Sequence, residues 1–236
     1  INSFVIIKRK KSKNLSITSK FSLLITFFLL TFGTILFLVF EYNNSSTLKD
    51  MNFLDKIINS FFQSVTLRTA GFNTVPLGNI KPATVFISYI FMFIGASPGS
   101  TGGGIKTTTF GILILYAFGV LKRKEYVEVF KRRIDWELIN KALAIVVISI
   151  FYIVVVTTII LSIESFTTDK VIYEVLSAFS TTGLSMGITA GLGIISKLIL
   201  VVTMFIGRLG PMTVALAFTS NKTSSIKYPK EDILIG

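Results

Sequence analysis

The sequence contains no cysteine and no histidine among its 236 residues. Without cysteine it has no disulfide and no thiolate, and without histidine it lacks the usual proton shuttle and the commonest ligand of transition metals. Acidic residues are also scarce, with 12 against 24 lysines and arginines. These absences disfavour most enzyme mechanisms, so the sequence predicts a protein that is not an enzyme and has no covalently bound cofactor.

Hydrophobic residues, in contrast, make up 51% of the chain, including 22 phenylalanines. This fraction is high for a water-soluble domain and indicates a protein that faces lipid. The formal net charge is +12, but the basic residues gather in clusters between long apolar runs. That distribution is typical of cytoplasmic loops rather than of a nucleic-acid surface. We therefore expect a multi-pass protein of the cell membrane, with the lipid bilayer and no nucleic acid as its partner.

Four membrane-crossing segments are predicted from length and composition. The apolar runs at residues 21–40 and 138–163 are each long enough to cross the hydrocarbon core as one helix. Residues 194–218 form a third span that is interrupted by a single arginine. Residues 83–95 and 108–121 are each too short to cross alone, so together they predict a fourth span broken by a glycine-rich segment.

Two amphipathic segments, residues 52–67 and 170–180, lie between these spans. When every basic cluster is placed on the cytoplasmic side, successive spans run outward and return, and both segments fall on the outer side. They are long enough to enter the membrane only halfway. We interpret them as pore helices.

An internal repeat relates the two halves of the chain. Gly71 in TAGF and Gly183 in TTGL are 112 residues apart (183 − 71), and the tetrapeptide MFIG at residues 92–95 recurs at 204–207 with the same offset (207 − 95). Both ends of each repeat lie inside the cell, so the repeats are parallel and can surround a common axis, unlike inverted repeats. The predicted fold is an all-α membrane protein with two parallel span, pore-helix, span repeats of a potassium-channel-like pore, at residues 21–121 and 138–218.

Two short segments resemble the start of the TVGYG filter of potassium channels. Such a filter directs consecutive carbonyl oxygens at the ion, and glycine adopts the required backbone angles without a Cβ penalty. The half-helix before each segment points its partly negative C-terminus toward the same place, which favours a cation. We predict that K⁺ binds backbone carbonyls around Gly71 and Gly183. The filter residues are Thr69, Ala70, Gly71, Phe72, Thr181, Thr182, Gly183 and Leu184.

The glycine-rich break predicts a gating loop beneath this filter. It differs from a phosphate-binding Walker A motif because Ile105 separates Gly104 from Lys106 and no strand precedes it. Irregular backbone at membrane depth is tolerated only where it is buried in protein or lines water. The predicted gating residues are Ala96, Ser97, Pro98, Gly99, Ser100, Thr101, Gly102, Gly103, Gly104 and Lys106.

Arg208 follows the second MFIG at the equivalent position. A charge near the bilayer centre costs about 2.5 to 3.5 kcal/mol on insertion scales unless it finds acceptors. Carbonyl groups of the predicted gating loop are candidate acceptors, so we predict that Arg208 is the gate partner. The alternative is an arginine that extends to the membrane surface.

With these motifs the chain resembles the Ktr/Trk/HKT potassium transporter superfamily, and within it the membrane subunit of the Ktr type. The motifs are RTAGFNT at 68–74, ASPGSTGGGIKTTT at 96–109, TTGLSMG at 181–187 and GRLGP at 207–211. The resemblance implies four repeats around one pore, of which this chain holds the third and fourth. It implies further that residues 1–20 are a cytoplasmic basic linker, 122–137 a second cytoplasmic linker and 219–236 a cytoplasmic tail, with an N-terminal half missing.

The resemblance also implies a homodimer docked on a cytosolic nucleotide-binding regulatory subunit of the RCK type. Two residues depart from the family pattern, Thr182 and Leu67. Alternatives stay open at this point: a sodium-selective or sodium/potassium transporter of the same superfamily, or a membrane-bound phosphate-binding enzyme. The enzyme is disfavoured because the segment from Ala83 to Leu121 contains no acidic metal ligand.

Overall fold

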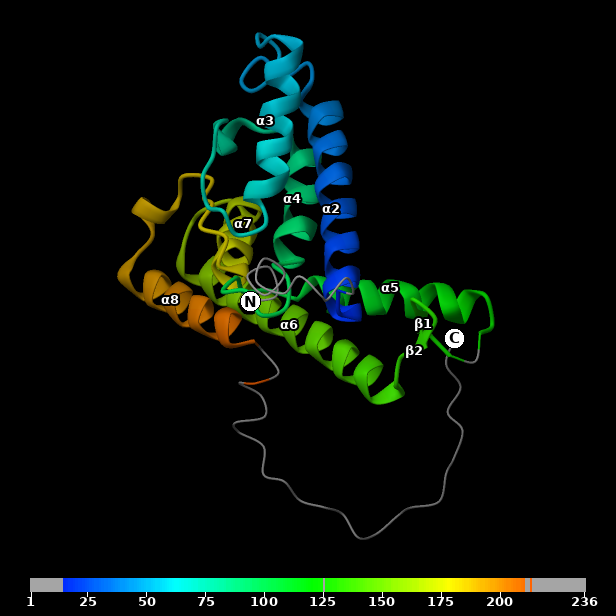
Figure 1. Ribbon diagram of the computed structural model, residues 1–236. Coiled ribbons are helices and arrows are strands. Elements are labelled where there is room, and N and C mark those ends of the chain that lie inside the picture. The colour runs from blue at the N-terminus through cyan, green and yellow to red at the C-terminus, as the bar shows by residue number, and fades with distance from the viewer. Residues whose placement is uncertain (1–14, 125, 211–212, 214–236) are drawn as a thin grey trace, which may run out of the picture.

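The computed structural model describes residues 15–124, 126–210 and 213, and it is mainly helical (Figure 1). The predicted linker residues 1–14 and the tail from residue 219 lie outside the described part of the chain. The helices are α2 (Ile17–Glu41), α3 (Phe53–Thr66), α4 (Pro82–Phe93), α5 (Thr107–Leu121), α6 (Trp136–Ile163), α7 (Thr168–Ser180) and α8 (Ile194–Leu209), with 3-10 turns η1 (Leu77–Asn79) and η2 (Thr189–Gly191).

The same order of elements occurs twice along the chain. A long helix, a short helix, a 3-10 turn and another helix form the first unit (α2, α3, η1, α4) and again the second unit (α6, α7, η2, α8). The offset of 112 residues relates the start of η1 to that of η2 (189 − 77) and the start of α4 to that of α8 (194 − 82). The predicted half-helices at 52–67 and 170–180 are helical as α3 and α7.

Two described helices, α2 and α6, are long and apolar enough to cross a membrane. They correspond to the predicted spans at 21–40 and 138–163. The shorter apolar helices α4 and α5 correspond to the two parts of the predicted broken span. The span predicted at 194–218 is helical from Ile194 to Leu209 as α8, and residues 211–212 and 214–218 lie outside the described part.

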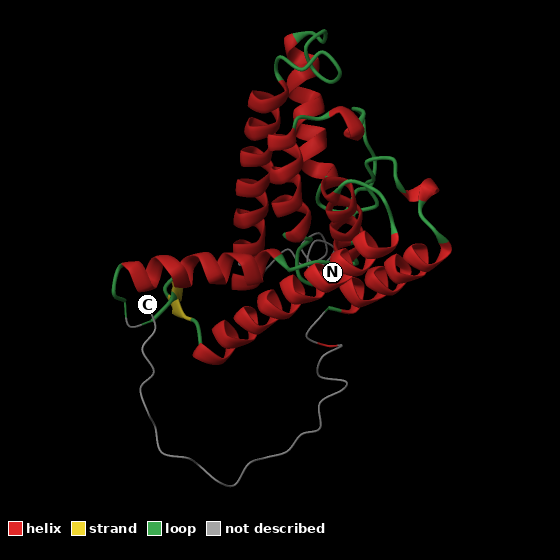
Figure 2. Ribbon diagram, turned by 180° about the vertical axis from the view of Figure 1, so that it is seen from behind, coloured by secondary structure: helices red, strands yellow, loops and turns green. Residues whose placement is uncertain are grey.

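Helix α5 does not continue the line of α4. In Figures 1 and 2, α4 runs alongside α2, whereas α5 extends across that direction near the start of α2. The chain turns between them at residues 94–106, where a proline and several glycines prevent a continuous helix. The start of α5 is joined to α2 by the hydroxyl groups of Ser22 and Thr107, 3.2 Å apart.

A short antiparallel hairpin, β1 (Glu128–Val129) and β2 (Arg132–Arg133), connects the two units. The all-α expectation misses it, because strands of two residues carry no detectable periodicity in the sequence. Its turn places Phe130 and Lys131 at positive φ. The hairpin falls within the predicted linker at residues 122–137.

Each unit uses a glutamate to cap the start of its last helix, α4 or α8. The buried Glu41 carboxylate accepts hydrogen bonds from the Lys81 backbone N–H at 2.9 Å and from the Thr84 hydroxyl, at the start of α4. Glu164 accepts from the Gly193 N–H at 2.8 Å and from the Ser196 hydroxyl at 2.6 Å, at the start of α8. Both carboxylates satisfy free N–H groups and face the positive end of a helix.

The units pack through α4 and α7. The Tyr89 and Tyr173 rings meet edge to face with centroids 6.1 Å apart, and the Phe93 and Phe179 rings stack at 6.5 Å. Within the first unit, α2 and α3 approach so closely at Gly33 that a Cβ there would overlap the Ser64 hydroxyl. This packing brings the C-terminal ends of α3 and α7 to the same region of the molecule.

Candidate functional site: two glycine turns and the loop beside them

The predicted filter segments form two turns with the same backbone pattern. In the first glycine turn (residues 68–72), Thr69 and Gly71 have φ of 71° and 78°. In the second glycine turn (residues 180–184), Thr181 and Gly183 have φ of 54° and 84°. A β-branched residue rarely adopts positive φ, so its repetition at both threonines is a strained feature of the kind found at functional sites.

The two glycine turns contact each other through their glycines. A Cβ on Gly71 would lie 2.8 Å from the Thr182 carbonyl oxygen, and a Cβ on Gly183 would lie 3.5 Å from the Gly71 Cα. Glycine is therefore required at residue 71 both by its positive φ and by the close approach. Segments 112 residues apart in sequence thus meet at one point, each directly after the C-terminus of a short helix.

Hydroxyl groups hold each turn in a different way. In the first turn, the Phe72 N–H donates to the Thr66 hydroxyl at 3.0 Å, and this hydroxyl donates back to the Phe72 carbonyl. In the second turn, the Thr182 hydroxyl pairs with the Ser180 hydroxyl at 2.7 Å. The family departure at Thr182 therefore adds a buried polar group that already has a partner.

The other predicted residues of the two turns differ in exposure. Phe72 is exposed, whereas its counterpart Leu184 is buried in the core. Leu67, the second departure, ends α3 and is also buried in the core, where it packs as an apolar residue. The two turns are therefore alike in backbone and unlike in side-chain surroundings.

The loop between α4 and α5 (residues 94–106, hereafter the connecting loop) lies against both glycine turns. A Cβ on Gly102 would lie 2.9 Å from the Thr69 hydroxyl oxygen, and the Gly103 N–H donates to the Thr181 hydroxyl at 2.8 Å. A Cβ on Gly103 would approach the Phe179 carbonyl oxygen to 2.8 Å. The glycines of this segment are thus used for close approach to the two turns.

The connecting loop has a buried half and an exposed half. Residues 102–105 are buried beside the turns, whereas residues 98–101 are exposed. The exposed half is a turn in which the Ser100 N–H donates to the Ser97 carbonyl at 3.2 Å. The Lys106 ammonium group donates to the Gly102 carbonyl at 2.6 Å, and this hydrogen bond links the two ends of the buried half.

Two equivalent glycines make close backbone approaches near the turns, one within the connecting loop and one between α8 and α7. A Cβ on Gly95 would overlap the Gly103 carbonyl oxygen, and a Cβ on its counterpart Gly207 would overlap the Phe179 carbonyl oxygen. The Arg68 guanidinium also reaches the Gly95 carbonyl at 3.5 Å. Arg68 therefore ties the first glycine turn to the start of the connecting loop, a contact that the sequence motif alone did not identify.

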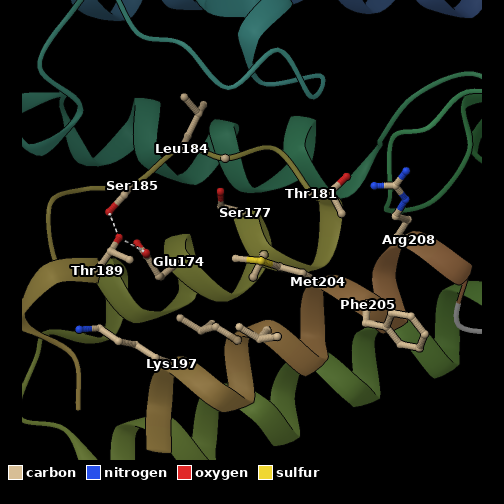
Figure 3. A pocket seen from close by; sticks show the side chains of 14 residues that line it. Glu174, Ser177, Thr181, Leu184, Ser185, Thr189, Lys197, Met204, Phe205 and Arg208 are labelled. Atoms are coloured by element: carbon tan, nitrogen blue, oxygen red, sulfur yellow. Dashed lines mark hydrogen bonds between the residues drawn. The ribbon is translucent and has the colours of Figure 1, made fainter. Parts of the chain in front are cut away.

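Arg208 lies on α8 at the rim of an open cavity of about 640 Å³ (Figure 3). The same cavity is lined by Thr181 and Gly183 of the second glycine turn. Arg208 is exposed, and within the described residues it makes no hydrogen bond or ion pair. The cations that contact carbonyls of the connecting loop in this structure are Lys106 and Arg68 instead.

Glu174 is a further charged residue of this cavity that sequence reasoning missed. It lies on α7, and its side chain is only 7% exposed. One carboxylate oxygen accepts from the Thr189 hydroxyl, which in turn pairs with the Ser185 hydroxyl at 2.9 Å (Figure 3). Within the part of the chain that the structure describes, the other oxygen has no hydrogen-bond partner. An acidic residue within a half-helix was the available signal, because intramembrane charges are rare and functional.

Comparison with known proteins agrees with this architecture. Residues 9–227 match the TrkH family, described as cation transport protein. The potassium transporter TrkH from Vibrio parahaemolyticus, known from a crystal structure, has the same fold over 83% of this chain and 43% of its own, with a TM-score of 0.70 and 20% identity.

Curated relatives are more similar in sequence. Ktr system potassium uptake protein B from Vibrio alginolyticus is 38% identical over 97% of this chain and 50% of its own length. The protein of the same name from Bacillus subtilis is 36% identical, over 99% and 52%. The potassium/sodium uptake protein NtpJ from Enterococcus hirae is 36% identical, over 98% and 52%. The chain spans about half the length of these relatives.

The family match and the curated relatives, together with the mainly helical fold, indicate a helical membrane protein of the transport class rather than an enzyme. The chain belongs to the TrkH family of cation transport proteins. This confirms the resemblance drawn from the four sequence motifs.

Proposed function

We propose that this chain supplies two of the pore-lining units of a protein that takes up K⁺ through a channel-like pore across the cell membrane. The observation that carries the proposal is the meeting of Gly71 and Gly183 in two turns of the same backbone pattern, each after the C-terminus of a short helix. Backbone carbonyls at such a point, with two helix C-termini directed at it, favour a dehydrated monovalent cation.

In this proposal the residues 69–72 and 181–184 are the selectivity filter, and the connecting loop is the gate. The loop is supported in that role by its contacts with both turns, through Gly102 at Thr69 and Gly103 at Thr181. The proposed partner of the gate, Arg208, would meet the loop only after a rearrangement, since it lies at the rim of the cavity and has no hydrogen bond within the described residues.

Two units cannot surround an ion, and the second unit has an open face where a further unit would pack. In the first unit, Tyr89 and Phe93 of α4 contact the rings of α7. Their counterparts at the 112-residue offset, Val201 and Phe205 of α8, line the open cavity and are 59% and 63% exposed. By the same symmetry, the short helix of another unit would occupy that cavity and complete the filter. This supports a four-unit pore in the complete protein.

Sodium transport is the second candidate, favoured by one observation. The relative NtpJ is named a potassium/sodium uptake protein, and it is about as similar to this chain as the potassium uptake protein from Bacillus subtilis. From the resemblance we also propose that the complete protein forms a homodimer on a cytosolic nucleotide-binding ring of the RCK type.

The test is uptake of K⁺ or Rb⁺ by the complete protein in cells that lack their own uptake systems, with Na⁺ as competitor. We expect K⁺ uptake that Na⁺ inhibits weakly, and a loss of discrimination of roughly tenfold in Gly71→Ser and Gly183→Ser. Gly78→Ser is the matched control, because Gly78 has ordinary space for a Cβ and lies outside the turns. Equal uptake of both ions by the unaltered protein would favour the sodium/potassium alternative, and unchanged discrimination in both variants would refute the filter assignment.

A further inference from the structure

A small pocket of about 150 Å³ lies between the end of α5 and the β1–β2 hairpin, remote from the glycine turns. Its lining has two parts of different chemistry. Leu115 and Phe118 of α5 form an apolar side. The polar rim carries two positive charges and one negative charge, and it consists of Lys122, Lys124, Tyr126 and Glu128. An apolar side next to two ammonium groups is the arrangement expected of a site for an amphipathic anion.

The hairpin is held firmly against α5. Val127 and Val129 are buried, and the Ile134 N–H donates to the Val127 carbonyl at 2.9 Å. Val127 packs over Gly119, where an added Cβ would lie 3.9 Å from its side chain. The Lys124 N–H also donates to the Gly119 carbonyl at 2.9 Å. The rim of the pocket is therefore built on ordered backbone.

Positive charge is concentrated around this pocket. Six cations lie in or beside the hairpin and are exposed, and within the described residues none of them forms an ion pair. The Arg133 guanidinium lies over the Tyr126 ring, 5.5 Å from its centroid. The six residues are Lys122, Arg123, Lys124, Lys131, Arg132 and Arg133.

Exposed aromatic side chains stand beside these cations. Trp136, at the start of the long apolar helix α6, is 46% exposed and packs edge to face on Tyr116 of α5 with centroids 5.7 Å apart. Phe130 at the hairpin turn is also exposed. Tryptophan and tyrosine beside basic residues at the ends of apolar helices mark the boundary between hydrocarbon and lipid headgroups. Figure 1 shows the hairpin between the ends of α5 and α6.

We propose that this pocket binds the headgroup of an anionic phospholipid of the inner leaflet. Lys122 and Lys124 contact the lipid phosphate, and an acyl chain follows Leu115 and Phe118 along α5. The other cations of the hairpin raise the local concentration of anionic lipid. The proposal depends on membrane location and not on which ion is transported.

The test uses Trp136, which is the only tryptophan of these 236 residues. The complete protein is reconstituted in vesicles that contain brominated phosphatidylglycerol or brominated phosphatidylcholine, and tryptophan quenching is compared. The same measurement on Trp136→Phe gives the quenching of any tryptophans elsewhere in the complete protein. Subtracting it leaves the quenching of Trp136. We expect the anionic lipid to quench Trp136 at least twofold more strongly, and this preference to disappear in Lys122→Gln/Lys124→Gln.

The matched control is Lys49→Gln/Lys81→Gln, which removes two exposed positive charges from the opposite end of the first unit and should keep the preference. Equal quenching by both lipids, or a preference unchanged in Lys122→Gln/Lys124→Gln, would overturn the proposal. Loss of a copurifying cytosolic protein in that variant, with lipid preference intact, would assign the surface to a protein partner instead. Full competition by inorganic phosphate would show a site for free phosphate and also overturn it.

A variant that fails to fold does not block the test. Lys122→Arg/Lys124→Arg keeps both charges and should keep the preference. The unaltered protein gives an independent readout, since phosphatidylglycerol should raise its melting temperature more than phosphatidylcholine does. No difference between the two lipids in that measurement would contradict the proposal.

Discussion

The two units have the same elements and nearly the same turns, but they diverge within the shared MFIG sequence. In the first unit, α4 ends at Phe93 and the chain enters the connecting loop. In the second, α8 continues through Gly207 and Arg208 to Leu209. One repeated pattern thus provides the glycine turn twice and the connecting loop only once. The difference teaches that the connecting loop is a local modification of one repeat within an otherwise symmetrical frame.

The glycines at the point of divergence provide the strongest test of this comparison. Gly95 and Gly207 are equivalent, and a Cβ on either would overlap a carbonyl oxygen. We expect Gly95→Ala and Gly207→Ala each to lower the free energy of unfolding by about 3 kcal/mol and to reduce uptake more than tenfold, because backbone must shift. Thermal unfolding and ion uptake measure this. Gly99→Ala, which has open space but positive φ, is the control and should cost less. Normal behaviour of either overlapping variant would show that the two backbones are not packed as described.

Whether the sequence predicts a feature of this structure depends on how far apart in the sequence the interacting residues lie. The half-helices and the glycine turns follow from local patterns, such as TAGF and TTGL after amphipathic segments, and the helices α3 and α7 lie where those patterns predict. The caps by Glu41 and Glu164 could not be predicted, since each carboxylate binds a helix start at least 29 residues away in sequence. The turn of α5 away from α4 depends likewise on contacts with α2, including the Ser22 and Thr107 hydroxyls.

The candidate site was predictable to the same degree. The motifs identified the residues of both turns and of the connecting loop, because a glycine-rich break inside an apolar segment is a local signal. They did not identify that Lys106 and Arg68, rather than Arg208, contact loop carbonyls in this structure. Which cation reaches a given carbonyl depends on the direction of α5 and α8, and that direction comes from tertiary packing.

The hydroxyl groups of the two strained threonines, Thr69 and Thr181, make different contacts in the two units. Thr181 accepts a hydrogen bond from the Gly103 N–H, whereas Thr69 only contacts Gly102. We expect Thr181→Val to leave that N–H without its acceptor, to loosen the connecting loop and to change K⁺ flux about fivefold, with a cost of about 1 kcal/mol. Thr69→Val should change flux less than twofold. Uptake rates and hydrogen exchange at Gly103 measure both. Equal effects of the two substitutions would mean that Thr181 does not hold the connecting loop more strongly than Thr69 does.

The two cations beside the site give a smaller contrast. Lys106 bonds the Gly102 carbonyl, and Arg208 has no hydrogen bond within the described residues. If Arg208 engages the loop only in another state of the gate, Arg208→Met should alter the voltage or ligand dependence of uptake and leave stability unchanged. Lys106→Met should lower stability by about 1.5 kcal/mol, because a charge-assisted hydrogen bond is lost. Wild-type flux and gating in Arg208→Met would remove Arg208 from the proposed gate.

The capping glutamates give the smallest and most pH-specific contrast. Hydrogen bonds from Ser196 and then Gly193 lower the pKa of the Glu164 carboxyl below its ordinary value of 4.5. A lowered pKa means that the unfolded chain binds the proton more readily, so this stabilisation is complete above pH 4.5 and is lost as the pH falls through the folded pKa. We expect the melting temperature of the detergent-solubilised protein to fall in that acidic range, and Ser196→Ala to reduce the dependence.

Asp169 is a second carboxyl with a lowered pKa, because hydrogen bonding from Thr167 holds its pKa below the ordinary value. The measurement is therefore made in an Asp169→Asn background, with Glu164→Gln as the reference that lacks the titrating cap. A melting temperature with the same pH dependence in Glu164→Gln and in its parent would show that this carboxylate does not cap α8. In that case the two units would correspond in their turns and helix starts but not in a capping glutamate. The cap by Glu41 would then be a feature of the first unit alone.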